Sequence, residues 1–233
     1  MYELVLGDDA GVDAWAIVLA AGTATRFGGA KQWARLGGER LVDRSVAIAT
    51  AACGDVVVVL APGVNWDGAP VSAAVTGGAE RADSVRAGLA VVPDWIEIVV
   101  VHDAAHPLAS RALFDAVVRE VGNGADAAVP VLPATETVVA LHEGALGAVG
   151  SGAPLALAQM PHAFNAKVLR EAHRDAPASR DDASLLVSLG RRVVAVPGET
   201  TNLHVTTREE LVLAERMLAL PGSTSRAPRS AGG

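Results

Sequence analysis

Two polar loops hold most of the residue types that could do chemistry in this chain. The first runs from Leu19 to Gln32 and carries Arg26 and Lys31 after a series of small residues. Small residues let backbone amides approach a triphosphate, and the two cations add positive charge. Cations beside an α-phosphorus stabilise the transition state of attack on it more than the ground state. The loop matches neither the Walker A pattern nor the dinucleotide fingerprint, and the alternative interpretation is an ordinary glycine turn with two solvated cations.

The second loop follows a Val-rich segment and reads Val101-His-Asp-Ala-Ala-His-Pro107. The carboxylate of Asp103 could hold Mg²⁺ or a ribose hydroxyl, or it could instead cap the segment that follows. His102 and His106 flank it, but one carboxylate and two imidazoles without a fixed geometry do not define a zinc site. Because Asp103 stands at the end of a buried strand opposite the first loop, we take it as a candidate magnesium ligand.

A third segment lies between these loops and begins with Gly77 and Gly78, followed by the start of a helix. Such a helix start suits contact with a base or a phosphate through backbone groups. A plain connecting loop is the alternative, and composition does not decide between them.

Short Val-rich segments of strand length alternate with segments of helical spacing. We expect strands at residues 14–20, 55–61, 96–101, 125–132 and 192–196. We expect helices at residues 39–52, 82–92, 110–121, 181–189 and 207–220, with Ser110 as an N-cap. This alternation predicts an α/β fold with a Rossmann-like, doubly wound and mostly parallel sheet. Ligands of such sheets bind at the carboxyl ends of the strands, where the first two loops fall.

Residues 135–157 interrupt this rhythm with weak alternation and many glycines. We expect a projecting β-hairpin arm that contacts a second copy in a homodimer. Residues 1–220 are then expected to form a single domain, and residues 221–233, rich in Gly, Ser, Pro and Arg, are expected to be a disordered tail.

Composition limits the partners. The 233 residues are 51% hydrophobic and carry a formal net charge of −7, with no basic stripe, which argues against non-specific nucleic-acid binding. Cys53 is the only cysteine, so the chain can form neither an intramolecular disulfide nor a Cys-based metal cluster. No apolar segment approaches the length of a membrane span, and the first residues lack the order of a signal peptide. The expected location is the cytoplasm, without a membrane partner.

Together these segments resemble the 2-C-methyl-D-erythritol 4-phosphate cytidylyltransferase family from about Ala14 to Leu220. The matching stretches are Ala20-Ala-Gly with Arg26 and Lys31-Gln32, Gly78-Ala-Glu-Arg-Ala-Asp-Ser-Val, Val101-His-Asp-Ala-Ala, Gln159 with Pro161 and Ala163-Phe164, Asp181-Asp-Ala-Ser, and Asn202 with Val205-Thr206. The resemblance implies that CTP and a polyol phosphate give a CDP-alcohol and pyrophosphate with Mg²⁺ or another divalent cation.

The resemblance also implies roles for individual residues. Arg26 and Lys31 would stabilise the pentavalent phosphorus, and Asp103 would lie between nucleotide and acceptor. The residues expected to cradle the nucleotide are Ala20, Ala21, Gly22, Gly78 and Ser84. The acceptor phosphate would attack in line without a general base. The arm would complete the acceptor site of the partner copy.

The chain departs from the family pattern mainly at the acceptor side. The family's Arg before Pro in the second loop is His106 here, and the Lys two residues after Asn202 is His204. The other departures are Glu136-Thr137-Val-Val139 for Asp-Thr-X-Lys, Ser151-Gly152 for Asp-Arg, Met160 and His162 within Gln-Thr-Pro-Gln, and Arg180 for Thr. The candidate acceptor-binding residues are therefore His106, Thr137, Arg180 and His204. Loss of two permanent cations would weaken binding of a dianion by roughly a hundredfold or more unless it is compensated.

Three hypotheses remain open. The first is an active enzyme on 2-C-methyl-D-erythritol 4-phosphate, in which Arg180 and the histidines replace the lost cations. The second is a nucleotidyltransferase for another small polyol phosphate, such as a pentitol phosphate. The third is a catalytically weak nucleotide-binding paralogue. His142 and His173 are expected to be surface residues without a role.

Overall fold

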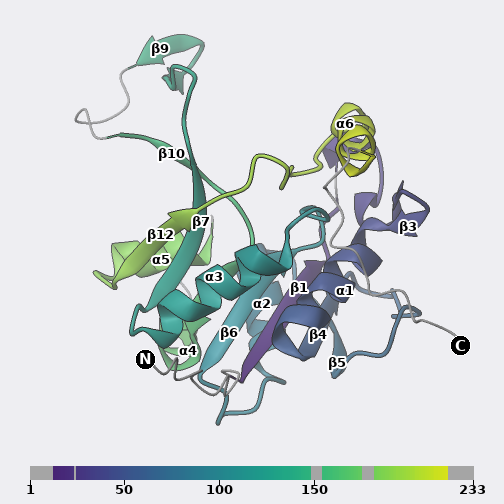
Figure 1. The fold of residues 1–233 in the computed structure, drawn as a ribbon, viewed down its shortest axis with the longest axis vertical. Helices are drawn as coiled ribbons and strands as arrows, with labels where there is room; N and C mark the ends of the chain where they lie inside the picture. The colour runs from purple at the N-terminus through teal and green to yellow at the C-terminus, as the bar shows by residue number, and fades with distance from the viewer. Residues whose placement is uncertain (1–12, 24, 148–153, 175–180, 220–233) are drawn as a thin grey trace, which may run out of the picture.

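The computed structural model describes residues 13–23, 25–147, 154–174 and 181–219 (Figure 1). Within these residues an eight-stranded sheet has the order β10-β7-β11-β6-β1-β4-β5, and β12 pairs with β7 off this path. The strands of the main sheet are β1 (Ala14–Ala20), β4 (Asp55–Leu60), β5 (Ala73–Thr76), β6 (Ile98–Asp103), β7 (Ala127–Pro133), β10 (Ala156–Ala158), β11 (His162–Asn165) and β12 (Val193–Pro197). Expectation and structure therefore agree on an α/β sheet fold.

Most neighbours in the sheet are parallel. β1 pairs in parallel with both β4 and β6, β4 with β5, and β7 with β12. β10 and β11 run antiparallel to their neighbours, and β11 lies between β6 and β7. The predicted Rossmann-like, mostly parallel sheet is confirmed, with antiparallel strands inserted on one side of it.

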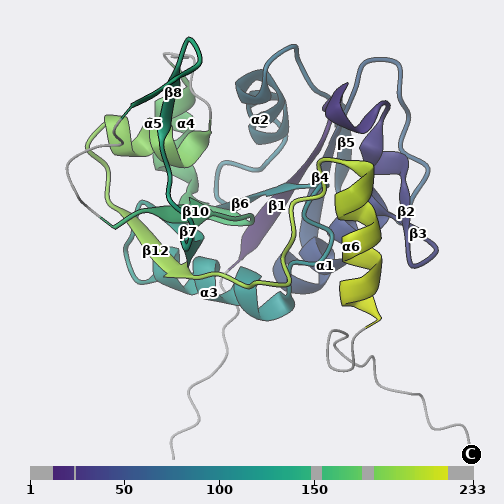
Figure 2. The same cartoon turned by 90° about the horizontal axis from the view of Figure 1, so that it is seen from above.

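Helices cover both faces of the sheet, as a doubly wound fold requires. The α-helices are α1 (Leu41–Cys53), α2 (Arg81–Leu89), α3 (Arg111–Gly122), α4 (Ala166–Arg174), α5 (Asp182–Ser188) and α6 (Arg208–Leu218). Figure 2 shows α1 and α3 on one face and α2, α4 and α5 on the other. No helix within the described residues is both long and apolar enough to span a membrane.

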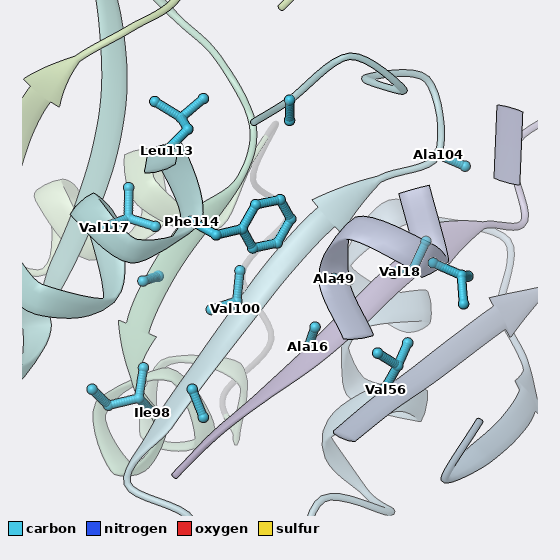
Figure 3. Close-up of a cluster of buried hydrophobic side chains, with 14 of the residues drawn as sticks. Ala16, Val18, Ala49, Val56, Ile98, Val100, Ala104, Leu113, Phe114 and Val117 are labelled. Carbon is cyan, nitrogen blue, oxygen red and sulfur yellow. The ribbon is translucent and has the colours of Figure 1, made fainter. Parts of the chain in front are cut away.

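The two faces of the strands bury separate hydrophobic clusters. Ala16 and Val18 of β1 point toward α1 and α3, where Phe114 is fully buried (Figure 3). Ile17 and Leu19 alternate with them and pack toward α2, α4 and α5. This alternation explains why the strands read as continuous apolar segments, since both faces exclude water.

Helix starts follow local side-chain chemistry. Ser110 caps α3 by accepting a hydrogen bond from the amide of Leu113, as predicted. Thr207 and Glu210 form a reciprocal capping box at the start of α6. These caps satisfy amides that have no partner inside the helix.

The arm is a separate two-stranded sheet of β8 (Ala140–His142) and β9 (Ala145–Gly147). Glu143 and Gly144 form the turn with φ of 48° and 86°, the left-handed region that a tight hairpin turn requires. Figure 1 shows this hairpin standing away from the main sheet. The predicted hairpin is present over these residues; residues 148–153 and the expected tail at 221–233 lie outside the described residues.

The elements that were not predicted include β5, β10, β11 and α4, and β10 belongs to the main sheet although its first two residues fall within the arm expected at 135–157. β5 follows β4 without an intervening helix, and β11 and α4 occupy residues 162–174. Because α4 was missed, His173 was wrongly expected at the surface. It lies on α4 and is only 4% exposed, whereas His142 on the arm is exposed as expected.

Candidate active site

A cavity of about 710 Å³ opens at the carboxyl ends of β1, β4 and β6. Its wall is formed by Leu19, Ala20, Ala21, Gly22, Thr23, Arg26, Lys31, Gln32, Ala61, Pro62, Gly77, Gly78, Ala79, Glu80, Arg81, Ser84, Asp103, Ala104, Ala105, His204 and Thr206. The volume suits a small-molecule ligand of nucleotide size. The three segments that the sequence indicated as possible ligand-binding loops therefore line the same cavity.

Strand register explains why the first two loops meet. Leu19 of β1 lies opposite Asp103 of β6, and the amide of Ala104 donates to the carbonyl of Leu19 over 3.0 Å. Each loop therefore leaves the sheet at the same level. The expectation that they lie side by side at the carboxyl edge is confirmed.

The first loop presents two cations to the cavity. Arg26 lies in η1 (Thr25–Phe27) and is exposed, and Lys31 begins η2 (Lys31–Trp33) and is half-buried. Burial lowers the pKa of Lys31, and the charge of Arg26 acts in the same direction against the opposing charge of Asp103. Two positively charged side chains that face the same cavity are suited to binding an anionic ligand.

Neighbouring side chains hold this loop in place. The ring of Phe27 is 7% exposed and packs in a small cluster with Leu36 of β2 (Arg35–Leu36) and Ala214 of α6. The guanidinium group of Arg40 lies 5.0 Å from the ring of Trp33 and 5.7 Å from that of Trp66, within the range of a cation–π contact. Arg40 therefore connects η2, which carries Lys31, to the loop after β4.

The glycine segment approaches the first loop closely. A Cβ atom at Gly77 would lie 2.5 Å from Oγ of Ser84 and 2.9 Å from Cβ of Ala21. A Cβ at Gly78 would lie 2.2 Å from Cβ of Asp83. Only glycine fits at these two positions, because real Cβ atoms do not reach such distances. By contrast, a Cβ at Gly22 would meet nothing within 4 Å.

Asp103 lies on the cavity wall with one carboxylate oxygen engaged. Its Oδ1 accepts a hydrogen bond of 2.8 Å from the amide of Ala105, so the alternative role of capping the following segment is present as well. Burial acts to raise the pKa of Asp103, but this hydrogen bond and the charge of Lys31 outweigh it, and the net pKa is lowered. The side chain is therefore ionised at neutral pH, and Oδ2 has no hydrogen-bond partner among the described residues.

This geometry fits a magnesium ion. Among the described residues no three His, Cys, Asp or Glu side chains form a metal-holding cluster. Mg²⁺ nevertheless commonly takes one or two carboxylates together with substrate phosphates and water. A single ionised Asp103 on the wall of this cavity meets that requirement.

The two histidines of the acceptor group form a stacked pair. The rings of His106 and His204 have centroids 4.7 Å apart and an interplanar angle of 12°. Burial, with the neighbouring His204, lowers the pKa of His106 to about 4, and partial burial also lowers the pKa of His204. Both are mainly uncharged near pH 7, as is His162, whose pKa burial lowers to about 4. The histidines therefore do not supply the cations expected of them.

Residues 198–206, which we call the strap, run from β12 to α6 along the carboxyl edge of the sheet (Figure 2). The Gln159 side chain accepts from the amide of Glu199 and donates to the carbonyls of Glu199 and Asn202. The Glu199 carboxylate in turn accepts from the amide and hydroxyl of Ser110. The strap is thus held by the loop between β10 and β11 and by the start of α3 before it brings His204 and Thr206 to the cavity.

Sequence reasoning gave Arg81 no role, although the segment containing it was noted. Arg81 lines the cavity and forms an ion pair with Asp182, which is 2% exposed. Nε2 of the buried His173 lies 2.8 Å from the other oxygen of Asp182. The two adjacent carboxylates, Asp181 and Asp182, are visible in the sequence. The ion pair could not be predicted from it, because Arg81 stands 101 residues before Asp182.

The predicted residues fall into three groups: those that line the cavity, those that are described but lie outside it, and one that is outside the described residues. The proposed catalytic and nucleotide-binding residues all line the cavity: Ala20, Ala21, Gly22, Arg26, Lys31, Gly78, Ser84 and Asp103. Of the acceptor group, His204 lines it, His106 is buried behind His204, and Thr137 is exposed on the stem of the arm. Arg180 lies outside the described residues.

The chain matches the family model described as IspD, 2-C-methyl-D-erythritol 4-phosphate cytidylyltransferase, over residues 14–219. It is 39% identical over 216 residues to the 2-C-methyl-D-erythritol 4-phosphate cytidylyltransferase of Rhodococcus jostii, covering 87% of this chain and 94% of that protein. It is also 39% identical over 212 residues to the bifunctional enzyme IspD/IspF of Paracoccus denitrificans, covering 87% of this chain but only 55% of that longer protein.

Solved structures show the same likeness. The crystal structure of 2-C-methyl-D-erythritol 4-phosphate cytidylyltransferase from Thermus thermophilus superposes with a TM-score of 0.74 at 34% sequence identity. The match covers 88% of this chain and 98% of that one.

Proposed function

The chain belongs to the 2-C-methyl-D-erythritol 4-phosphate cytidylyltransferase family, and on that premise we propose that it joins CTP to 2-C-methyl-D-erythritol 4-phosphate. A phosphate oxygen of the acceptor attacks the α-phosphorus of CTP. The bond from that phosphorus to the β-phosphate oxygen breaks, and pyrophosphate leaves with the electron pair. The products are CDP-methylerythritol and pyrophosphate.

The observation that carries this proposal is the convergence of Arg26, Lys31 and Asp103 on one cavity bounded by two glycine-containing loops. Arg26 and Lys31 stabilise the charge that develops on the pentavalent phosphorus and on the leaving pyrophosphate. The backbone of Ala20, Ala21 and Gly22 lies along the triphosphate, while Gly78 and Ser84 cradle the nucleoside. The two cations carried by the first loop support placing the triphosphate beside that loop.

The protein's contribution is positioning and charge stabilisation. The acceptor phosphate is already a strong nucleophile, so no general base is required. Mg²⁺ or another divalent ion, held by Asp103 and the triphosphate, would neutralise charge on the phosphate oxygens. Because CTP and polyol phosphates are substrates found inside cells, we also propose a cytoplasmic location.

We propose that the acceptor site is completed by a second copy of the chain. On the arm, Leu141 is 69% and Leu146 is 74% exposed, and apolar side chains gathered on a projecting hairpin suit a protein contact. Thr137 lies on the stem of the same arm, outside the cavity of its own chain. A homodimer in which each arm reaches the partner's cavity would bring Thr137 to the acceptor.

One observation favours a second candidate function. His106 and His204 are mainly uncharged near neutrality, so none of the candidate acceptor residues within the described part of the chain carries a permanent positive charge for a dianion. A nucleotidyltransferase with another small polyol phosphate, such as a pentitol phosphate, is therefore the alternative. A catalytically weak nucleotide-binding protein is disfavoured, because Arg26, Lys31 and Asp103 remain together at the cavity.

Pyrophosphate release measured with CTP and Mg²⁺ tests the proposal, with 2-C-methyl-D-erythritol 4-phosphate offered beside a panel of pentitol and sugar phosphates. Rapid release with 2-C-methyl-D-erythritol 4-phosphate alone is the expected result. Release only with another acceptor would establish the second function. No release with any acceptor, despite demonstrable CTP binding, would sink both enzymatic proposals.

A further inference from the structure

The ammonium group of Lys31 contacts the strap. Its Nζ lies 3.5 Å from Nε2 of His204. No other hydrogen-bond or ion-pair partner of Nζ is found among the described residues. A lysine ammonium group has protons to donate and no acceptor site, so Nε2 of His204 must be the acceptor and carries no proton.

The ring of His204 is itself held by a second ring. It stacks on His106, with centroids 4.7 Å apart and planes 12° from parallel. Nδ1 of His106 lies 3.2 Å from Oδ1 of Asn202, while Nδ2 of Asn202 donates to the carbonyl of Met160 over 2.6 Å. This second bond fixes the amide orientation, so the oxygen faces His106 and Nδ1 of His106 donates to it.

The backbone on each side of His204 is also fixed. The carbonyl of Asn202 accepts from Nε2 of Gln159 over 3.0 Å, and the amide of Val205 donates to the carbonyl of Ala105 over 2.8 Å. Asn202 is 1% and Val205 0% exposed, whereas His204 between them is exposed. His204 therefore projects from a strap that is anchored two residues before it and at the residue after it.

We propose that His204 is a positioning residue for Lys31, held in place by the stacked ring of His106 and the amide of Asn202. This inference rests on the proposed function in one respect, namely that Lys31 acts on the nucleotide. A lysine side chain is flexible and loses rotamer freedom when it is ordered. Nε2 of His204 is a fixed hydrogen-bond acceptor for the ammonium group, and it lowers this entropic cost of ordering Lys31 during catalysis. His204 therefore acts through Lys31 and does not bind the phosphate of the acceptor substrate.

Two substitutions at His204 separate this role from simple packing. His204→Phe keeps a ring that can stack on His106 but removes the acceptor nitrogen. His204→Gln keeps an acceptor atom at a similar reach. Because the side chain is exposed, both variants are expected to fold.

We expect His204→Phe to lower kcat on the order of 10- to 100-fold, with KM for CTP and for the acceptor near the wild-type values. His204→Gln should recover most of that loss. A raised acceptor KM with unchanged kcat in His204→Phe would show that His204 contacts the acceptor and would overturn the proposal. Equal losses in the two variants would overturn it as well.

A second measurement does not depend on turnover. The chain has two lysines, Lys31 and the exposed Lys167 on α4, so protein labelled with ¹⁵N and ¹³C only in lysine gives two side-chain Nζ signals. His204→Phe should move the Lys31 signal, His204→Gln should leave it near its wild-type position, and the Lys167 signal should stay constant throughout. An unchanged Lys31 signal in His204→Phe would refute the contact. If the wild type used no acceptor, the proposed function would fail, while this spectrum would still decide the role of His204.

Discussion

The guanidinium group of Arg81 forms an ion pair with the carboxylate of Asp182, which lies 101 residues further along the chain. Arg81 stands on the cavity wall at the start of α2, and Asp182 begins α5. The buried His173 of α4 contacts the second carboxylate oxygen. One carboxylate thus connects the wall of the cavity with two helices of the other half of the sheet.

This carboxylate should make stability depend on pH. Burial acts to raise the pKa of Asp182, but its contacts with His173 and Arg81 outweigh burial, and the net pKa falls below the ordinary value of 3.8. A group with a lowered folded-state pKa stabilises fully above its unfolded pKa and loses that contribution as pH falls through the folded value. We expect Asp182→Asn to lower the free energy of unfolding by roughly 1–3 kcal/mol at pH 7. Urea denaturation at pH 7, 5 and 3 should show the difference from wild type shrinking only below about pH 3.8.

The matched control is Asp115→Asn. Asp115 pairs with Arg111 on the surface, where the two side chains are 48% and 53% exposed, so the expected change is within about 0.5 kcal/mol. Equal losses for the two variants, or a loss at Asp182 that does not vary with pH, would contradict the assigned role of the buried carboxylate.

Lys31→Ala and Arg26→Ala should lower kcat by about 100-fold or more while changing CTP affinity modestly. The reason is that both cations are proposed to act on charge that exists mainly in the transition state. Steady-state pyrophosphate release gives kcat, and calorimetric titration gives the dissociation constant for CTP. Lys167→Ala is the control, since Lys167 is exposed on α4 and away from the cavity wall. Near-normal turnover in Lys31→Ala or Arg26→Ala would remove that residue from the catalytic group.

Gly22→Ala should separate nucleotide binding from folding. A Cβ at Gly22 meets nothing within 4 Å, so the melting temperature should remain at the wild-type value. The new methyl group would stand between the backbone and the triphosphate, and we expect CTP affinity to fall on the order of tenfold, about 1.4 kcal/mol.

Gly77→Ala is the comparison for that variant. Its Cβ would collide with Ser84 and Ala21, so it should destabilise the fold by roughly 1–3 kcal/mol. Melting temperatures and CTP dissociation constants measured for Gly22→Ala and Gly77→Ala test both expectations. A Gly22→Ala protein that binds CTP as tightly as wild type would mean that the triphosphate does not lie along this backbone.

Leu146→Asp should weaken the proposed homodimer. Leu146 is 74% exposed on β9, and a carboxylate there would be desolvated in the contact. Sedimentation velocity should show a dimer for wild type and a shift toward monomer for Leu146→Asp. Leu213→Asp on α6, where Leu213 is 46% exposed, should leave the dimer intact. A monomeric wild type at working concentration would refute the arm as a dimer contact.

The sequence was sufficient for the elements whose residues are buried on both faces. The residues of β1 point alternately into the two hydrophobic clusters, so this strand has to be apolar throughout. That continuous apolar segment is what predicts a strand at residues 14–20. β5 and β11 are four residues long, too short for a periodic pattern to identify them. β11 also owes its place between β6 and β7 to tertiary pairing, and α4 was missed with it.

The candidate site divides in the same way. The first two loops on the cavity wall could be located because each follows a predicted strand, and the carboxyl ends of parallel strands meet at one edge of the sheet. The arrangement of His106 and His204 could not be predicted, since stacking and burial, which determine their charge, depend on where the strap crosses the second loop. Thr137 lies outside the cavity of its own chain, and its proposed role requires a second copy, whose position a sequence pattern does not give.

The small cluster of Phe27, Leu36, Leu41, Val205 and Ala214 is separate from the two clusters that flank the sheet. It joins the loop carrying Arg26 and Lys31 to the strap and α6. Proteins open in cooperative units whose opening free energies differ, and units with few buried contacts open most readily. The loop that carries Arg26 and Lys31, the strap and α6 should therefore exchange their amide hydrogens together and well before the central strands, so that the cationic wall of the cavity opens as one unit while the sheet beneath it stays closed.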